Sequence, residues 1–179
     1  GVESPAGPIE TALQLRAVGD LDGAIRLLYK ALGNDFTNHQ VVGVLASMLS
    51  ENEQFEKADK LFERALSLRE PDRMVLLNYG TYLGHRGKLR ESVQALSRAA
   101  GQIARALAQS LHGGSFEGYT TGELYGQLGT AECNMARAYL ELGEHDVTLS
   151  LAEKWMVVES TWEMASMVVS ESLDRREVD

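Results

Sequence analysis

The chain is poor in cysteine, proline and aromatic residues, and each shortage removes a class of structure. A single cysteine among 179 residues, Cys133, excludes an internal disulfide framework. Only three prolines occur, and two of them, Pro5 and Pro8, lie at the start, so helices can fill nearly all that follows. Aromatic residues make up 7% of the chain and threonine is sparse, which favours an all-α fold over strands.

Long apolar runs are also absent. No stretch approaches the ~18 residues of a membrane-spanning helix, and no signal-peptide pattern is present. We therefore expect a soluble chain, with the cytoplasm as the favoured compartment. The sequence begins GVESPAGP without methionine, so the missing signal peptide says little about location.

Basic charge is scarce in the second half of the chain, and the formal net charge is −9. Residues 1–100 carry 12 Lys+Arg against 13 Asp+Glu, whereas residues 101–179 carry 5 against 13. Nucleic-acid binding needs a basic footprint, so we expect no nucleic-acid partner. The acidic half favours a basic protein partner through long-range attraction, and its alternative role is solubility.

What the chain does contain is a 34-residue period. The small residues Ala24, Ala58 and Ser92 stand 34 apart, and their neighbourhoods agree. Large residues follow each of them at the same distance; these are Leu28, Phe62 and Leu96. The pattern predicts two helices per unit, in which small residues let the helix axes approach and large ones fill the gaps around them.

The turn inside each unit is the second part of the pattern. Gly19 and Gly87 suit the left-handed residue that ends a helix, and Glu53 takes that place in the second unit at a small energetic cost. Pro71 and Asp72 stand where the next helix is expected to begin, which agrees with the tolerance of proline in a first helical turn.

Three segments carry a resemblance to a known family: AVGDLDGAIRLLYKAL (17–32), ENEQFEKADKLFERAL (51–66) and HRGKLRESVQALSRAA (85–100). Their period and their small/large pattern resemble the tetratricopeptide repeat family. The tryptophan often found early in that family's first helix is absent from all three copies, and the closing proline appears only as Pro71. The resemblance implies a right-handed α-solenoid of helix–turn–helix repeats with a C-terminal capping helix.

The repeat phase predicts one domain over residues 1–179. Its predicted parts are repeat 1 (about 5–37), repeat 2 (about 38–71), repeat 3 (about 72–105), an inserted hairpin tip (about 106–127), repeat 4 (about 128–159) and the capping helix (about 160–176).

The insertion follows from the spacing between Ser92 and Thr148, which is 56 residues, or one period plus 22. Helical patterns continue on both sides of it, so we expect two lengthened helices joined by a tip with the sequence HGGSFEGYTT. Thr120 or Thr121, together with Glu123, offers the start of the second helix.

The glycines of this tip do not indicate catalysis. No Gly-Lys-Ser/Thr of a phosphate-binding loop follows them, and the chain has no G-x-S-x-G. None of the four histidines has metal-ligand spacing with another histidine or with the cysteine. We expect no enzyme activity, no cofactor and no metal.

Residues 146–176 contain no glycine or proline and predict either one long helix or two helices split at Ser160, where Ser160 and Glu163 could form a capping box. Trp155 and Trp162 would share one helix face, which favours packing in the core or cap, with a dimer seam as the alternative.

The resemblance implies a protein–protein interaction module, an adaptor or accessory domain, that binds a peptide or partner protein in a concave groove lined by the first helix of each repeat. The implied groove residues are Ser47, Glu51, Leu77, Asn78, Thr81, His85, Asn134, Arg137 and Glu141. Other positions in the same phase are Ile9, Leu13, Arg16, Gln40, Gly43, Met74 and Cys133. In this family an asparagine at the position of Asn78 and Asn134 often binds the ligand backbone, a task that suits an amide.

The aromatic residues of the tip are candidate loop contacts for a partner: Phe116, Tyr119 and Tyr125. The alternative function is a self-assembling structural scaffold that homo-oligomerises through the inserted hairpin and the C-terminal helix.

Overall fold

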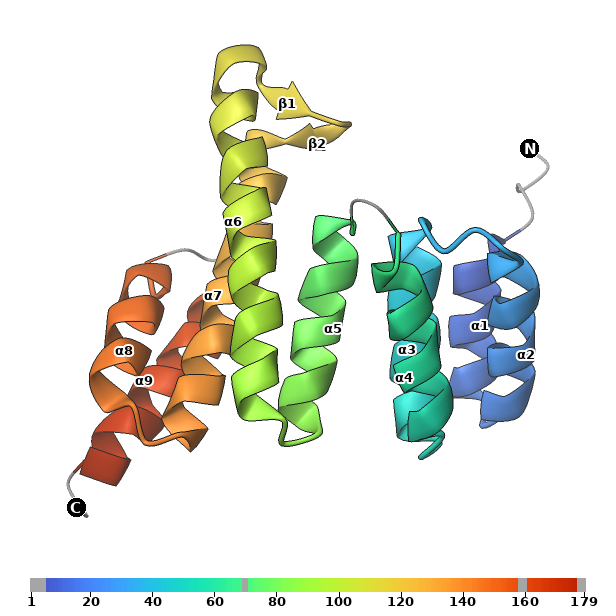
Figure 1. Ribbon diagram of the computed structural model, residues 1–179, viewed down its shortest axis with the longest axis horizontal. Helices are drawn as coiled ribbons and strands as arrows, with labels where there is room; N and C mark the ends of the chain where they lie inside the picture. Colours follow the sequence, from blue (N-terminus) through green and yellow to red (C-terminus); the bar gives the residue numbers. More distant parts are fainter. Residues whose placement is uncertain (1–5, 69–70, 158–160, 177–179) are drawn as a thin grey trace. The chain divides into compact units, whose positions relative to one another are not determined.

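The computed structural model describes residues 6–68, 71–157 and 161–176, and the chain divides into two compact units. The N-terminal unit comprises Gly1–Val75 and the C-terminal unit comprises Leu76–Asp179. Helices dominate both units, and a two-stranded hairpin is the single sheet among the described residues (Figure 1). The predicted all-α class is confirmed.

The elements of the N-terminal unit are α1 (Pro8–Ala17), α2 (Leu21–Leu32), α3 (His39–Glu51), α4 (Phe55–Leu66) and the first residues of α5 (Arg73–His85). In this unit α1 packs on α2, α2 on α3 and α3 on α4 (Figure 1). The small and large positions of the repeat are buried together, as the pattern predicted. They include Ala24, Leu28, Leu49, Ala58 and Phe62, each at most 1% exposed.

The turn positions adopt the left-handed backbone expected of them. Gly19 has φ 89°, Gly87 has φ 74°, and Gly143 occupies the matching turn after α7 with φ 79°. Glu53 takes the same conformation with φ 56°, although its Cβ makes that region unfavourable. The repeat geometry is therefore kept where glycine is missing.

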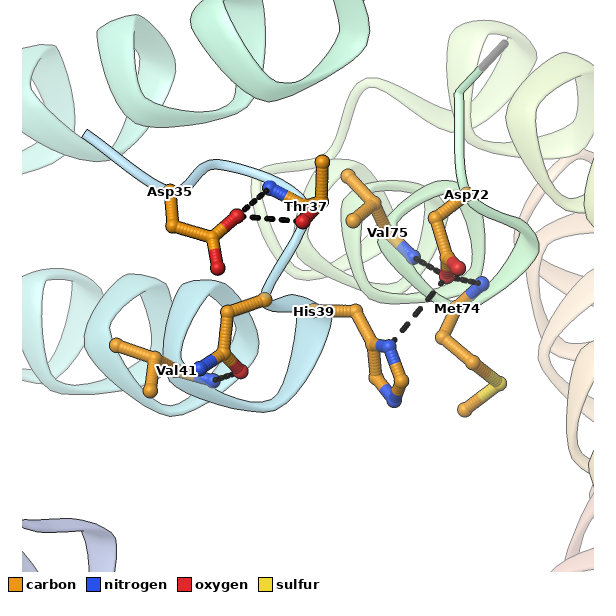
Figure 2. Close-up of polar contacts among 8 residues, drawn as sticks. Asp35, Thr37, His39, Val41, Asp72, Met74 and Val75 are labelled. Carbon is orange, nitrogen blue, oxygen red and sulfur yellow. Dashed lines mark hydrogen bonds and ion pairs between the residues drawn. The ribbon is translucent and has the colours of Figure 1, made fainter. Parts of the chain in front are cut away.

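Side-chain caps begin the helices that follow long connections (Figure 2). The Asp72 carboxylate accepts hydrogen bonds from the backbone N–H groups of Met74 (2.7 Å) and Val75 (3.3 Å) at the start of α5. The same oxygen lies 3.7 Å from His39 Nδ1. Asn38 caps α3 in a similar way. The predicted start of a helix after Pro71–Asp72 is confirmed.

The C-terminal unit continues α5 and adds a long helical arm and a C-terminal helix pair (Figure 1). Its elements are α6 (Leu89–Gly113), β1 (Ser115–Phe116), β2 (Tyr119–Thr120), α7 (Thr121–Glu141), α8 (His145–Ala152), the 3-10 turn η1 (Glu153–Trp155) and α9 (Trp162–Arg176). We call α6, β1, β2 and α7 the arm. Helix α8 packs on α7, and α9 packs on both.

The predicted lengthening of two helices is confirmed, because α6 has 25 residues and α7 has 21. Gly114 ends α6 with φ 77°, and Glu117 and Gly118 form a two-residue turn with φ 49° and 82°. Two consecutive residues with positive φ match the twist of a tight β-hairpin. The glycines of the tip therefore serve chain reversal.

Helix α7 begins with a capping box at one of the two threonines proposed for its start. The Glu123 backbone N–H donates to Thr120 Oγ1 at 3.2 Å, and the Thr120 backbone N–H donates to Glu123 Oε2 at 2.8 Å. Glu123 is therefore stabilised as a carboxylate, and the hydrogen bond from the Thr120 backbone lowers its pKa.

Residues 146–176 form two helices, so the hypothesis of one continuous helix is wrong. Trp155 interrupts the helix because its indole is buried (2% exposed) against α7, where Nε1–H donates to Glu132 Oε2 at 2.7 Å. Thr161 Oγ1 donates to the carbonyl oxygen of Trp155 at 2.9 Å on the far side of the break. Packing of Trp155 in the core is confirmed, whereas Ser160 and the Trp162 side chain lie outside the described residues.

Candidate protein-binding site

A pocket of about 210 Å³ lies in the C-terminal unit between α5, the start of α6 and α7. The residues that line it are Thr81, Gly84, His85, Leu89, Ser92, Asn134, Arg137, Ala138 and Glu141. Pockets for drug-sized ligands measure about 300–1,000 Å³, so this one suits one or two side chains of a partner better than a cofactor.

The floor of the pocket depends on close approach of α5 and α6. A Cβ on Gly80 would lie 2.5 Å from Leu96 Cγ, so the helices could not pack as they do with any other residue there. Ser92 is buried and donates from Oγ to the Gly80 carbonyl oxygen at 2.6 Å. Gly84 leaves a space beside Ser92, since its Cβ would lie 3.2 Å from Ser92 Oγ. The pocket therefore exists because the residues at this contact, Gly80, Gly84 and Ser92, are all small.

A polar network joins the two helices that wall the pocket. Asn134 Nδ2 on α7 donates to Thr81 Oγ1 on α5 at 2.9 Å, and Thr81 Oγ1 donates to the Leu77 carbonyl oxygen at 2.9 Å. Within the described residues, Asn134 Oδ1 makes no hydrogen bond. The amide is thus held in one orientation while its acceptor oxygen is available to a ligand N–H.

The charged residues of the pocket differ in how they are compensated. Glu141 forms an ion pair with Arg175, with 3.0 Å between Oε1 and Nη2. Arg175 also forms an ion pair with Glu171 at 2.6 Å. These hydrogen bonds, first of all the one to Glu141, raise the pKa of Arg175. Arg137 is half-buried and, among the residues that the structure describes, has no ion pair or hydrogen-bond partner. Its guanidinium is the uncompensated charge of the pocket.

The structure brings together most of the groove residues expected in the C-terminal unit. Thr81, His85, Asn134, Arg137 and Glu141 all line the one pocket. The lining residues that the sequence reasoning missed are Gly84, Leu89, Ser92 and Ala138. Ser92 carried a signal, because it occupies the small position of the repeat, where a helix pair approaches closely.

Two further expected residues of α5 lie outside this lining. Asn78 is half-buried, and Leu77 is 4% exposed, so the Leu77 side chain belongs to the buried core and offers little surface to a partner. Only its carbonyl oxygen takes part in the site, through Thr81.

The expected residues of the N-terminal unit, Ser47 and Glu51, are both exposed on α3. Glu51 is paired with Arg16 on α1, with 2.8 Å between Oε2 and Nε. The placement of these two residues as groove contacts stays a prediction.

Cys133, which has the phase of a groove residue, is instead fully buried, so that assignment is wrong. It packs in one cluster with Trp155 and Ala165 on the side of α7 that η1 and α9 cover. Burial raises the pKa of its thiol to about 11, so the thiol stays protonated at neutral pH and is a poor nucleophile. The repeat phase could not predict the burial of Cys133, because η1 and α9, which cover it, do not follow the repeat.

The three candidate loop contacts lie on the arm, away from the lining of the pocket. Phe116 and Tyr119 are half-buried in the hairpin tip. Tyr125 is 44% exposed and its ring centroid lies 4.8 Å from that of Trp155. None of the three aromatic residues lines the pocket.

Two other features are absent from the described part of the chain. It contains no group of three or more His, Cys, Asp or Glu side chains that could hold a metal ion. Nor does it contain a helix that is both long enough and apolar enough to cross a membrane.

The fold and the paired helices around this pocket define a helical-repeat protein of the all-α solenoid class. Residues 39–72 match the family model of the tetratricopeptide repeat, so the resemblance predicted from the sequence is confirmed. The fold is similar to that in the crystal structure of MamA, with a TM-score of 0.55 and 17% identity over 93% of this chain and 94% of that chain. At this identity the similarity shows the fold alone. A comparison with curated protein sequences gave no match.

Proposed function

We propose that the chain is a protein-interaction module whose C-terminal unit binds an extended segment of a partner protein in the pocket between α5 and α7. Helical repeats of this kind present side chains of neighbouring first helices to one ligand. One observation supports the proposal above all: the same pocket is lined by the fixed amide of Asn134 and by the guanidinium of Arg137, which has no partner in the described residues.

The two side chains suit different parts of a peptide. Asn134 Oδ1 would accept a hydrogen bond from a peptide N–H, which needs no particular ligand side chain. Arg137 would bind a carboxylate of the ligand, either an Asp or Glu side chain or a chain end. The proposal therefore favours an acidic group at this pocket, whereas the net charge of residues 101–179 favours a basic partner overall.

A selection experiment tests the proposal without knowledge of the natural partner. Random dodecapeptides displayed on phage are selected against the full chain, and a fluorescein-labelled copy of the most enriched peptide is titrated in an anisotropy assay. We expect Asn134→Ala and Arg137→Gln each to weaken binding about tenfold or more, the loss of one to two good hydrogen bonds. Enriched peptides should carry Asp or Glu.

Matched variants separate a local effect from a general one. Asn34→Ala and Arg26→Gln change exposed residues of the same types in the N-terminal unit and should leave the affinity unchanged. Circular dichroism confirms that all four variants fold. The proposal fails if no peptide is enriched, or if the pocket variants bind as the wild type does. The expectation that the chain is not an enzyme stays a prediction.

A further inference from the structure

Charge is strongly segregated along the C-terminal unit, and the proposed peptide pocket does not account for it. Residues 86–113 carry 5 Lys+Arg and 1 Asp+Glu, in a chain whose net charge is −9. Residues 114–179 carry 4 Lys+Arg and 13 Asp+Glu. A basic patch on an otherwise acidic protein attracts an acidic surface, and this chain itself supplies one.

The positive charge follows the solvent-facing side of α6. Arg98 and Arg105 are exposed and stand seven residues apart, which places them on one stripe of the helix about 10.5 Å apart along its axis. Neither arginine pairs with a carboxylate of the described residues; Arg105 Nε donates only to the Gly101 carbonyl oxygen, at 3.4 Å. We call this the basic stripe.

Small residues are exposed beside the basic stripe. Gly101, Ala104 and Ala108 are exposed on α6, and a Cβ added to Gly101 would meet nothing within 4 Å. Small exposed residues let a second helix lie close to the backbone, so that flanking arginines can reach carboxylates on either side of it.

Helix α8 presents the complementary charge with the same spacing. Asp146 and Glu153 are also seven residues apart, at the first turn of α8 and at the residue that follows it, and both are exposed. The Asp146 side chain is 89% exposed although it pairs with Arg176 at 2.7 Å, and Glu153 has no ion-pair partner in the described residues. Val147, 39% exposed, could fill the space above the small residues. We call Asp146 and Glu153 the acidic stripe.

From these two stripes we propose that the occupant of the outer face of α6 is helix α8 of a second copy of this chain. The charges and their seven-residue spacing match, and no ion pair joins the two stripes within the described residues of one chain. The contact joins unlike surfaces, so in a pair of copies one keeps its acidic stripe free and the other keeps its basic stripe free, and assembly continues beyond a dimer unless a ring closes. Exposed ion pairs are screened by salt, so this assembly depends on ionic strength.

Charge reversal and mixing test this inference with the full chain. Light scattering measures the mass at rising protein concentration in about 20 mM and about 500 mM NaCl, since the Debye length shortens severalfold between them. We expect the wild type to exceed the one-chain mass of 19.6 kDa at low salt and to return to it at high salt. The double variants Arg98→Glu/Arg105→Glu and Asp146→Lys/Glu153→Lys should each remain at the one-chain mass.

An equimolar mixture of the two double variants is the decisive sample. Each variant supplies the charge that the other lacks, so the mixture should regain the mass of the wild type. The control Arg26→Glu/Lys30→Glu reverses two exposed charges on α2 and should assemble normally. Circular dichroism checks the fold of every variant.

Three results would overturn the inference: a wild type that stays at the one-chain mass at low salt, assembly that neither double variant weakens, or a mixture that fails to assemble. None of these depends on the peptide pocket. Affinity for the selected dodecapeptide should be the same in the wild type and in both double variants, so the two proposals stand or fall separately.

Discussion

The helix pair α3–α4 and the arm, with its helices α6 and α7, both contain buried small residues but differ in the length of their helices. Both pairs contain buried alanines, Ala46 and Ala58 in the first and Ala99 and Ala131 in the second. Yet α3 and α4 have 13 and 12 residues, whereas α6 and α7 have 25 and 21. Small residues thus set how closely helices pack, while local signals at the ends set how long they are.

The support that each pair receives also differs. The α3–α4 pair lies within the residues that match the family model, whereas α7 is covered by η1 and α9, which follow no repeat. Changes at that covered side of α7 should therefore have the largest effects in the molecule.

The largest effect is expected for Trp155→Ala. This change removes a buried indole and its hydrogen bond to Glu132, which keeps only its ion pair with Lys154, and it should cost about 3–5 kcal/mol of stability. Hydrogen exchange of the α7 amides measures the loss. Val157→Ala, at a residue 88% exposed, should change the exchange by less than about 0.5 kcal/mol. Equal effects of the two changes would contradict the role given to Trp155.

Two glycine-to-alanine changes in the arm should act in opposite directions. A Cβ at Gly129 would lie 2.8 Å from Trp155 Cε3 and 2.7 Å from Thr161 Cγ2, so Gly129→Ala should destabilise by about 1–3 kcal/mol. Gly101 lies inside α6 with open space around it, so Gly101→Ala should stabilise by about 1 kcal/mol. Urea unfolding followed by circular dichroism measures both. If the urea midpoints of both variants shifted in the same direction, the close contact of Gly129 with Trp155 and Thr161 would not explain the difference between the two positions.

The turn inside α3–α4 can be compared with the turn between α5 and α6. Glu53→Gly should stabilise by about 1 kcal/mol, because it removes a Cβ from a left-handed backbone, and Gly87→Ala should destabilise by a similar amount. The urea midpoints of the two variants should therefore move in opposite directions. Unchanged midpoints would mean that the turn relaxes to accept either residue.

The smallest effect is expected at the capping box of α7. Thr120→Ala should cost about 0.5–1 kcal/mol, since the cap is exposed. Because the pKa of Glu123 is lower in the folded chain, its contribution is complete above the ordinary value of 4.5 and disappears as the pH falls through the lowered pKa. The NMR shift of the Thr120 amide should follow that titration, and it should stop doing so in Glu123→Gln.

The parts of the fold that could be predicted from the sequence are those with local signals. Gly19 and Gly87 predicted turns, and Thr120 with Glu123 predicted a helix start, because each acts on backbone within a few residues. The sequence offered Ser160 with Glu163 as a place for a split, but it offered no signal for the earlier end of α8 at Ala152 and the turn η1. That end depends on Trp155 reaching Glu132, 23 residues earlier, and nothing in the sequence around Trp155 interrupts a helical pattern.

The candidate site divides in the same way. Repeat phase predicted Asn134 and Arg137 as neighbours of Thr81 and His85, and these four residues share one pocket. Phase could not reveal that Arg137 has no partner in the described residues while Glu141 is paired with Arg175, because Arg175 lies in the irregular C-terminal helix. Charge compensation is a tertiary property that repeat spacing does not encode.

Binding of a partner segment between α5 and α7 can be observed residue by residue by NMR mapping. The backbone and side-chain amides of the full chain are followed as the selected dodecapeptide is added. We predict that the largest shifts cluster at Thr81, His85, Asn134 and Arg137, with the Asn134 side-chain amide among them. Shifts confined to the tip, at Phe116, Tyr119 and Tyr125, or spread over the outer face of α6, would show that the peptide does not bind between α5 and α7.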